Sequence, residues 1–171
     1  MVNEALLDHM FRTHGSDETR ALAEQLGRLL SSGDTLSLTG DLGAGKTTFT
    51  QGLAAGLEIP AGVVVNSPTF TILAEHREGR VPLYHFDVYR LSGPDDLYDL
   101  AFDEYADGSG VVVIEWADKI ADALPGDTLF IAIEMPSDGS QDDRDVSLRA
   151  SGPRSVELVN ALTRSWREAQ S

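Results

Sequence analysis

The chain of 171 residues contains no cysteine and few basic residues. Without cysteine it can form neither a disulfide framework nor a zinc site with cysteine ligands, and its four histidines lack the spacing of metal ligands. No apolar run approaches the 18 residues that a membrane helix requires. Glu4 and Asp8 precede the first basic residue, Arg12, where a signal peptide would carry positive charge and an apolar core. These absences predict a soluble, cytoplasmic protein.

The shortage of basic residues leaves a strong negative charge. Lysine and arginine number 13 against 28 acidic residues, so the formal net charge is −15. Such a surface disfavours direct, tight binding to a nucleic-acid backbone and is typical of a solvated acidic exterior. The length, with no linker, low-complexity tract or internal repeat, predicts one domain over residues 1–171.

One segment, residues 36–48, reads LSLTGDLGAGKTT and contains the pattern G-x-x-x-x-G-K-[ST]. The apolar residues before the pattern predict a buried strand, and residues 47–57 predict a helix. The alternative is a glycine-rich turn with a surface lysine. A strand, a loop and a helix in this order favour a phosphate-binding P-loop instead.

Each residue type in the loop suits phosphate binding. Gly40, Gly43 and Gly45 allow a tight turn, so that successive N–H groups and the helix N-terminus point at phosphate oxygens. Lys46 is then expected to bridge the β- and γ-phosphates. The hydroxyl of Thr47 is expected to complete a Mg²⁺ shell.

The remaining periodicity predicts alternating helices and strands. Helices are expected at 17–31, 47–57, 94–100, 117–124 and from Pro153 onward, and strands near 36–38, 63–65, 70–76, 81–88, 111–114, 129–133 and 146–148. Ser16 looks like the cap of the first helix, and residues 77–80 look like a hairpin turn. This order predicts an α/β fold, a P-loop NTPase-like three-layer sandwich whose sheet is parallel at its centre with antiparallel hairpin additions.

A nucleotide loop needs an acidic residue at the end of another strand, to orient Mg²⁺ or the attacking water. Glu115 follows the apolar run Val111 to Ile114 and resembles a Walker B acid. Asp87 ends an alternating strand and is the rival candidate. The sequence does not decide which carboxylate activates water.

Other polar and aromatic residues carry weaker signals. The segment Ser67-Pro68-Thr69 follows an expected strand and is placed like a switch loop near a γ-phosphate. His85 is expected in an outward or semi-buried strand position, and Trp116 is expected to serve in packing or in a partner surface. Because the Asn-Lys-x-Asp guanine motif is absent, and the D-x-x-G at 107–110 precedes a strand where a GTPase switch would follow one, ATP is favoured.

Taken together, these motifs resemble the bacterial TsaE (YjeE) family, the ATPase of tRNA threonylcarbamoyladenosine synthesis. The segments that carry the resemblance are Gly40 to Thr48 (GDLGAGKTT), Ser67 to Phe70 (SPTF), Tyr84 to Leu91 (YHFDVYRL) and Ile114 to Trp116 (IEW). They cover residues 16 to about 120 in order and spacing. The match fades beyond Ile120.

The resemblance implies a set of site residues. The residues expected to bind ATP are Ser16, Asp41, Leu42, Gly43, Ala44, Gly45, Lys46, Thr47 and Thr48. Thr47 and Glu115 are implied as Mg²⁺ ligands, and Asp87, Glu115 and Thr48 as catalytic residues. Ser16 is expected to approach the adenine or the ribose.

The resemblance also implies a partner, the TsaD–TsaB threonylcarbamoyl-transfer complex, which ATP hydrolysis would reset between turnovers. Contact with tRNA would then be indirect, in keeping with the acidic charge. Two alternatives stay open. A small-molecule kinase would share the loop but needs an acceptor pocket and usually an arginine-rich lid, and a nucleotide-dependent binding module would use Glu115 only to position metal.

Overall fold

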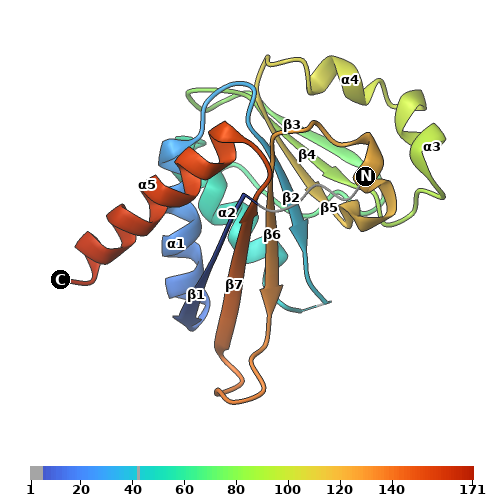
Figure 1. Cartoon of the computed structure of the whole chain (residues 1–171). Helices are drawn as coiled ribbons and strands as arrows, with labels where there is room; N and C mark the ends of the chain where they lie inside the picture. The colour runs from blue at the N-terminus through green and yellow to red at the C-terminus, as the bar shows by residue number, and fades with distance from the viewer. Residues whose placement is uncertain (1–5, 42) are drawn as a thin grey trace.

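The computed structural model describes residues 6–41 and 43–171, and its strands form one mixed sheet (Figure 1). The strands are β1 (Leu7–His14), β2 (Thr35–Thr39), β3 (Leu73–His76), β4 (Leu83–Asp87), β5 (Val111–Glu115), β6 (Thr128–Glu134) and β7 (Asp143–Ala150). Their order across the sheet is β1-β7-β6-β2-β5-β4-β3. The pairs β6–β2, β2–β5 and β5–β4 are parallel, whereas β1–β7, β7–β6 and β3–β4 are antiparallel. The predicted α/β class, with a parallel centre and antiparallel margins, is confirmed.

Helices cover the sheet unequally. They are α1 (Ser16–Leu29), α2 (Lys46–Gly56), α3 (Pro94–Asp99), α4 (Phe102–Tyr105), the 3₁₀ helix η1 (Ala117–Ala123) and α5 (Pro153–Ala169). The helices α1, α2 and α5 pack on one face, while α3, α4 and η1 cover the β4–β5 part of the other (Figure 1). Among the described residues, every helix is too short or too polar to cross a membrane.

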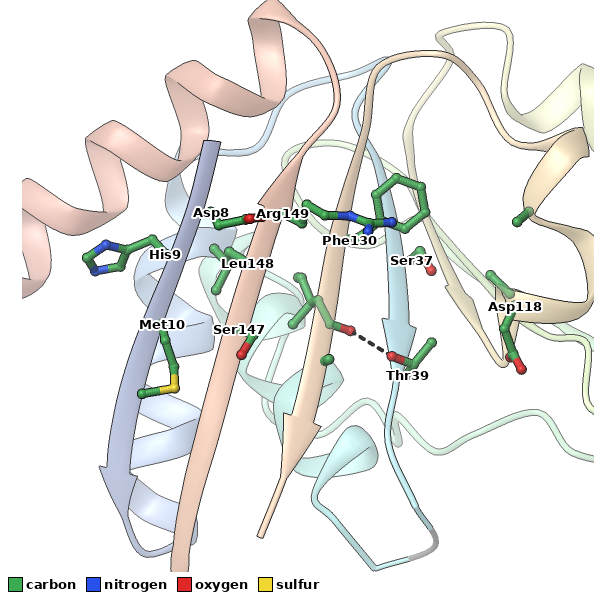
Figure 2. Close-up of a pocket in the computed structure, with 14 residues that line it drawn as sticks. Asp8, His9, Met10, Ser37, Thr39, Asp118, Phe130, Ser147, Leu148 and Arg149 are labelled. Carbon is green, nitrogen blue, oxygen red and sulfur yellow. Dashed lines mark hydrogen bonds between the residues drawn. The ribbon is translucent and has the colours of Figure 1, made fainter. Parts of the chain in front are cut away.

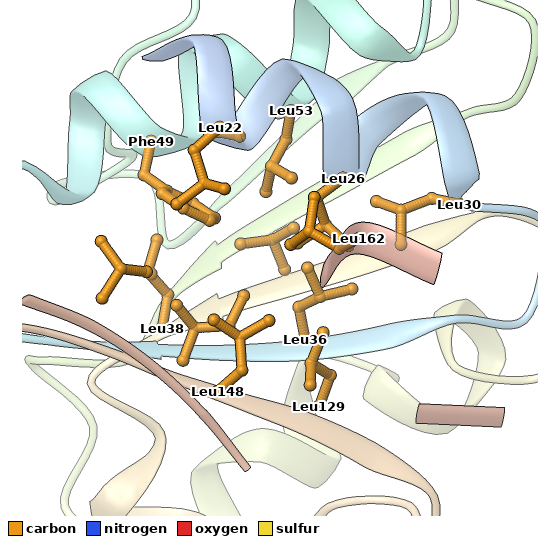
Figure 3. Packing of buried hydrophobic residues seen from close by; sticks show 14 of the residues in the cluster. Leu22, Leu26, Leu30, Leu36, Leu38, Phe49, Leu53, Leu129, Leu148 and Leu162 are labelled. Carbon is orange, nitrogen blue, oxygen red and sulfur yellow. The ribbon is translucent and has the colours of Figure 1, made fainter. Parts of the chain in front are cut away.

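The main core lies between the sheet and the layer of α1, α2 and α5. Figure 3 shows Leu22, Leu26, Phe49 and Leu53 from the helices pointing at Leu36, Leu38, Leu129 and Leu148 from the strands. Each of these side chains is at most 1 % exposed. This packing fixes the start of α2 against the end of β2.

Two expectations about local structure are wrong. The valines of 63–65 form no strand, and the loop there runs through bends and turns to β3. Ser16 does not cap α1, because the N-cap residue is Gly15 with a φ of 113° and Ser16 is already helical.

The N-terminal strand β1 was not expected from the sequence. It pairs with β7 along its whole length, from Leu7 opposite Ala150 to His14 opposite Asp143. Its inward positions alternate apolar Leu7 and Phe11 with polar His9 and Thr13, so the usual strand pattern is hidden.

Candidate active site

The glycine-rich loop between β2 and α2 has the backbone of a phosphate cradle. Gly45, with a φ of 113°, is the N-cap residue of α2, and no side chain in the described part of the chain caps this helix. The N–H groups of the first turn are therefore open to an anion, which the helix dipole also favours.

The loop glycines are required for two different reasons. Gly43 and Gly45 have φ values of 80° and 113°, and a Cβ added to either would meet no atom within 4 Å. These two positions need glycine for conformation, and they leave open space where a ligand would approach. Gly40 is crowded, because a Cβ there would lie 2.6 Å from the carbonyl oxygen of Ile133.

Lys46 is held inside the loop rather than extended into solvent. Only 7 % of the residue is exposed. Its ammonium donates hydrogen bonds to the carbonyl oxygens of Gly40 and, at 3.1 Å, Asp41, and lies 4.4 Å from the centroid of the Trp116 ring. This position puts a fixed positive charge beside the open start of α2.

The two strand-end acids lie side by side. Asp87 of β4 and Glu115 of β5 are direct partners in the parallel ladder, and Glu115 is also the partner of Leu38 on β2, just before the loop. Asp87 is 4 % exposed and Glu115 is 1 % exposed. The end of each strand therefore delivers a buried carboxylate to the same edge of the sheet, where open α/β sheets bind their ligands.

Glu115 is poised as a charged group with one free oxygen. Its Oε2 accepts a hydrogen bond from Nε2 of His85 at 3.1 Å, whereas Oε1 is buried with no partner among the described residues. Burial by itself raises the pKa of Glu115. The hydrogen bonds from His85 and Ser67 and the charge of Lys46 together lower it by more than burial raises it, so the pKa ends below its ordinary value. A charged carboxylate with an unpartnered oxygen fits a cation ligand.

His85 is fully buried, at 0 % exposure. The expectation of an outward or semi-buried position is therefore wrong. The physical reason is that His85 lies on the same side of β4 as Asp87, the side covered by α1, α2 and α5, and pairs with the carboxylate of Glu115 on the neighbouring strand.

The segment from Ser67 to Thr69 reaches both halves of the site. The hydroxyls of Ser67 and Thr47 lie 3.0 Å apart, and the hydroxyl of Thr69 donates to Oδ2 of Asp87 at 3.4 Å. Oδ1 of Asp87 accepts the backbone N–H of Tyr89 at 3.0 Å. This loop therefore links the start of α2 to a strand-end acid.

These groups surround one cavity of about 490 Å³. Its lining residues are Gly43, Gly45, Lys46, Thr47, Thr48, Ser67, Thr69, Asp87, Tyr89, Glu115 and Trp116. The volume is in the range of small-molecule and cofactor sites, and the polar groups converge from the ends of two strands, two loops and a helix start. Trp116, with a φ of 64°, contributes to this cavity as well as to packing.

A smaller cavity of about 240 Å³ lies on the other side of the loop. Ser16, Thr19, Thr48, Asp142 and Arg144 line it together with Gly43 to Gly45. The structure thus brings Ser16 and Thr48 next to the loop. Ala44 lines this cavity, while Asp41 is exposed and lies outside both cavities. Leu42 lies outside the described residues.

A larger cavity of about 690 Å³ lies on the sheet face that the helices leave open, over β1, β7, β6 and β2 (Figure 2). Met10, Ser147 and Arg149 line it, and the guanidinium of Arg149 lies 5.0 Å from the centroid of the Phe130 ring. The glycine loop, Lys46 and both strand-end acids lie outside it. The groups suited to phosphate binding line the cavity of about 490 Å³ instead.

The chain matches a known protein family over most of its length. The family model of the threonylcarbamoyl adenosine biosynthesis protein TsaE matches residues 13–146. The tRNA threonylcarbamoyladenosine biosynthesis protein TsaE of Bacillus subtilis is 46% identical over 154 residues, covering 90% of this chain and 93% of that protein. Its counterpart from Treponema pallidum is 42% identical over 130 residues, covering 76% and 94%.

A solved structure is similar as well. The crystal structure of YdiB from Bacillus superposes with a TM-score of 0.79 and 40% sequence identity, covering 93% of this chain and 96% of that one. The matched region contains the glycine loop, both strand-end acids and the loop from Ser67 to Thr69. The chain therefore belongs to the TsaE family of tRNA threonylcarbamoyladenosine biosynthesis proteins.

Proposed function

We propose that this protein is a Mg²⁺-dependent ATPase that acts on the TsaD–TsaB threonylcarbamoyl-transfer complex. The observation that carries the proposal is the single cavity in which Lys46 and Thr47 face the buried pair of Asp87 and Glu115. Phosphoryl transfer to water requires a cation and a metal-binding hydroxyl at a glycine loop, facing carboxylates from neighbouring strand ends.

The residues would divide the work as follows. The N–H groups at the start of α2 and the ammonium of Lys46 would bind the phosphates. The hydroxyl of Thr47 and the free Oε1 of Glu115 would hold Mg²⁺, whose charge would stabilise the negative charge that develops during transfer. Asp87, tied to Thr69 and to the backbone of Tyr89, would orient the attacking water.

The nucleotide is proposed to be ATP, with its adenosine toward the cavity of Ser16 and Thr48. The sequence lacks the Asn-Lys-x-Asp motif that a guanine site requires. The net charge of −15 disfavours direct binding of tRNA, which supports a role in which the partner complex binds the tRNA. The protein is proposed to act in the cytoplasm.

The test is phosphate release in the presence of the TsaD–TsaB complex, by the parent protein and three variants. Glu115→Gln keeps the shape of the side chain but loses its charge, so hydrolysis should nearly stop, and Asp87→Asn should slow it. Glu134→Gln is the matched control, because Glu134 is an exposed acid at the end of β6 that lies outside the cavity. Parent-like rates in both site variants would show that the strand-end assignment is wrong.

A screen for ATP-dependent phosphorylation of metabolites runs beside this assay. Transfer of the phosphoryl group to a metabolite, with no phosphate release to water, would show that the protein is a small-molecule kinase and not an ATPase.

A further inference from the structure

We propose that Arg144 on β7 is a positioning residue for nucleotide binding, because it holds the Ala44–Gly45 peptide group of the glycine loop in its phosphate-binding orientation. The inference rests on the proposed nucleotide site. It adds Arg144 to that site, although Arg144 is about 100 positions from Ala44 in the sequence. Arg144 belongs to the antiparallel β6–β7 hairpin, outside the unit of β2, the glycine loop and α2.

The guanidinium of Arg144 contacts the loop directly. Its Nε donates a hydrogen bond to the carbonyl oxygen of Ala44 at 2.8 Å, and its Nη2 donates to that of Gly43 at 3.5 Å. Both donors belong to one charged group, and the contact with Ala44 is the stronger restraint because it is much shorter. Two donors of one planar group thus act on two successive carbonyls.

The other side of the same guanidinium is fixed to its own hairpin. Nη1 donates to the carbonyl oxygens of Gln141 at 2.6 Å and Asp143 at 2.7 Å. The neighbouring backbone is part of the sheet, since Arg144 is the partner of Thr13 in the β1–β7 ladder. The side chain therefore ties the loop to a rigid part of the sheet.

The contact with Ala44 decides where the N–H of Gly45 points. In a trans peptide the carbonyl and the N–H point in opposite directions, so a carbonyl of Ala44 turned toward Arg144 turns the N–H of Gly45 away from it. Gly45 lines the nucleotide cavity, and its N–H is then available to a phosphate oxygen.

The loop needs such a restraint because its glycines do not supply one. Gly43 and Gly45 both have positive φ and open space around them, so alternative peptide orientations cost little. Holding the loop before the ligand arrives reduces the ordering cost of binding, which raises affinity.

Arg144 also lines the smaller cavity with Ser16 and Thr48, so a direct contact with the nucleoside is the competing role. Inorganic pyrophosphate separates the two. A residue that acts through the loop should affect pyrophosphate and ATP alike, whereas a residue that contacts the nucleoside should affect ATP alone.

The test compares Arg144→Ala and Arg144→Lys with the control Arg12→Ala. Arg12 lies opposite Asp145 and anchors the same hairpin through Asp145 and Asp138, but it makes no hydrogen bond to the described residues of the loop. Calorimetry should show that Arg144→Ala weakens ATP and pyrophosphate binding by about tenfold each, the loss expected for one charge-assisted hydrogen bond. Arg144→Lys should recover only part of this, and Arg12→Ala should bind both ligands like the parent.

Hydrogen exchange of residues 40–47 without ligand is the second readout. It should be faster in both Arg144 variants and unchanged in Arg12→Ala. Parent-like affinity and exchange in Arg144→Ala would overturn the proposal, as would a loss confined to ATP or an equal loss in Arg12→Ala. If Arg144→Ala does not fold, Arg144→Lys carries the same comparison. If the parent binds neither ligand, the proposed function fails, while the exchange measurement still decides the role of Arg144.

Discussion

At the scale of single residues, Lys46 offers the most direct test of the phosphate site. Replacing it with alanine removes a charge-assisted contact of about 1.5–3 kcal/mol, so ATP affinity should fall roughly ten- to 150-fold. Calorimetry measures this. Arg149→Ala removes a cation from the far face of the sheet and should bind ATP like the parent. Unchanged affinity in Lys46→Ala would remove the phosphate assignment.

Thr47 tests the metal assignment. Thr47→Val removes the hydroxyl while keeping the shape, and Thr47→Ser keeps the hydroxyl. We expect the valine variant to lose the increase in ATP affinity that Mg²⁺ gives, and the serine variant to retain it, because only the hydroxyl oxygen can join the metal shell. Titrations with Mg²⁺ and with a chelator measure the difference. Equal affinities with and without metal in the parent protein would contradict a ligand role.

The residues of the site differ in how visible they are in the sequence. The glycine loop and the apolar run before Glu115 have fixed spacings that follow from their physics, so both were predictable. The partnership of His85 with Glu115 was not, since it depends on the register of two strands that are 30 residues apart. Arg144 was missed for the same reason, because nothing near it in the sequence indicates a contact with Ala44.

At the scale of secondary structure elements, the contact between α1 and α2 depends on glycines. A Cβ on Gly52 would collide with the carbonyl oxygen of Arg20 and lie 2.6 Å from the Cβ of Ala23. The backbone cannot yield easily, so Gly52→Ala should lower the free energy of unfolding by about 1–3 kcal/mol, despite the higher helix propensity of alanine. Denaturant unfolding measures this. Gly62→Ala is the control, because a Cβ at Gly62 has open space, and equal stability of the two variants would contradict the close packing.

The pairing of β1 with β7 predicts a dependence on pH. Nδ1 of His14 lies 2.9 Å from Oδ1 of Asp143, and this contact raises the pKa of His14 above 6.5 and lowers the pKa of Asp143 below 3.8. The contribution of His14 to stability is complete below pH 6.5 and disappears as the pH rises through its raised pKa. The contribution of Asp143 is present above pH 3.8 and disappears as the pH falls through its lowered pKa.

The titration of His14 followed by NMR tests this contact. Its midpoint should lie above 6.5 in the parent protein and should fall in Asp143→Asn. Asp145→Asn, two pairs away on the partner strand and bound to Arg12, is the control and should leave the midpoint above 6.5. An ordinary midpoint for His14 in the parent protein would contradict the β1–β7 register.

The elements with a clean period were predictable, and those set by distant contacts were not. The helix α1 and the strand β5 follow directly from their apolar spacing. The helix α2 ends at Gly56, whose φ is not positive and whose role is to make room for the backbone of α1 at Glu24 and Arg28. The valines of 63–65 have the residues of a strand, but they pair with no strand among the described residues.

At the scale of the whole molecule, we expect the cavity to turn over ATP usefully only with the proposed partner complex. The structure provides the phosphate loop and two strand-end acids, and no basic side chain other than Lys46 lines the cavity among the described residues. A partner that orders the Ser67 to Thr69 loop or adds a charge at the γ-phosphate would complete the site. An arginine supplied in trans is worth about 10³–10⁵ in rate in other P-loop enzymes.

The measurement that tests this claim most directly is a titration of the TsaD–TsaB complex into the purified protein, with phosphate release followed at saturating Mg²⁺ and ATP. We predict slow release by the protein alone and a saturable rise of at least about tenfold as the complex is added, toward the larger factors if the partner supplies an arginine. The rise should be absent in Glu115→Gln. A rate that stays flat across the titration, with no association between the protein and the complex in the presence of ATP, would contradict the account.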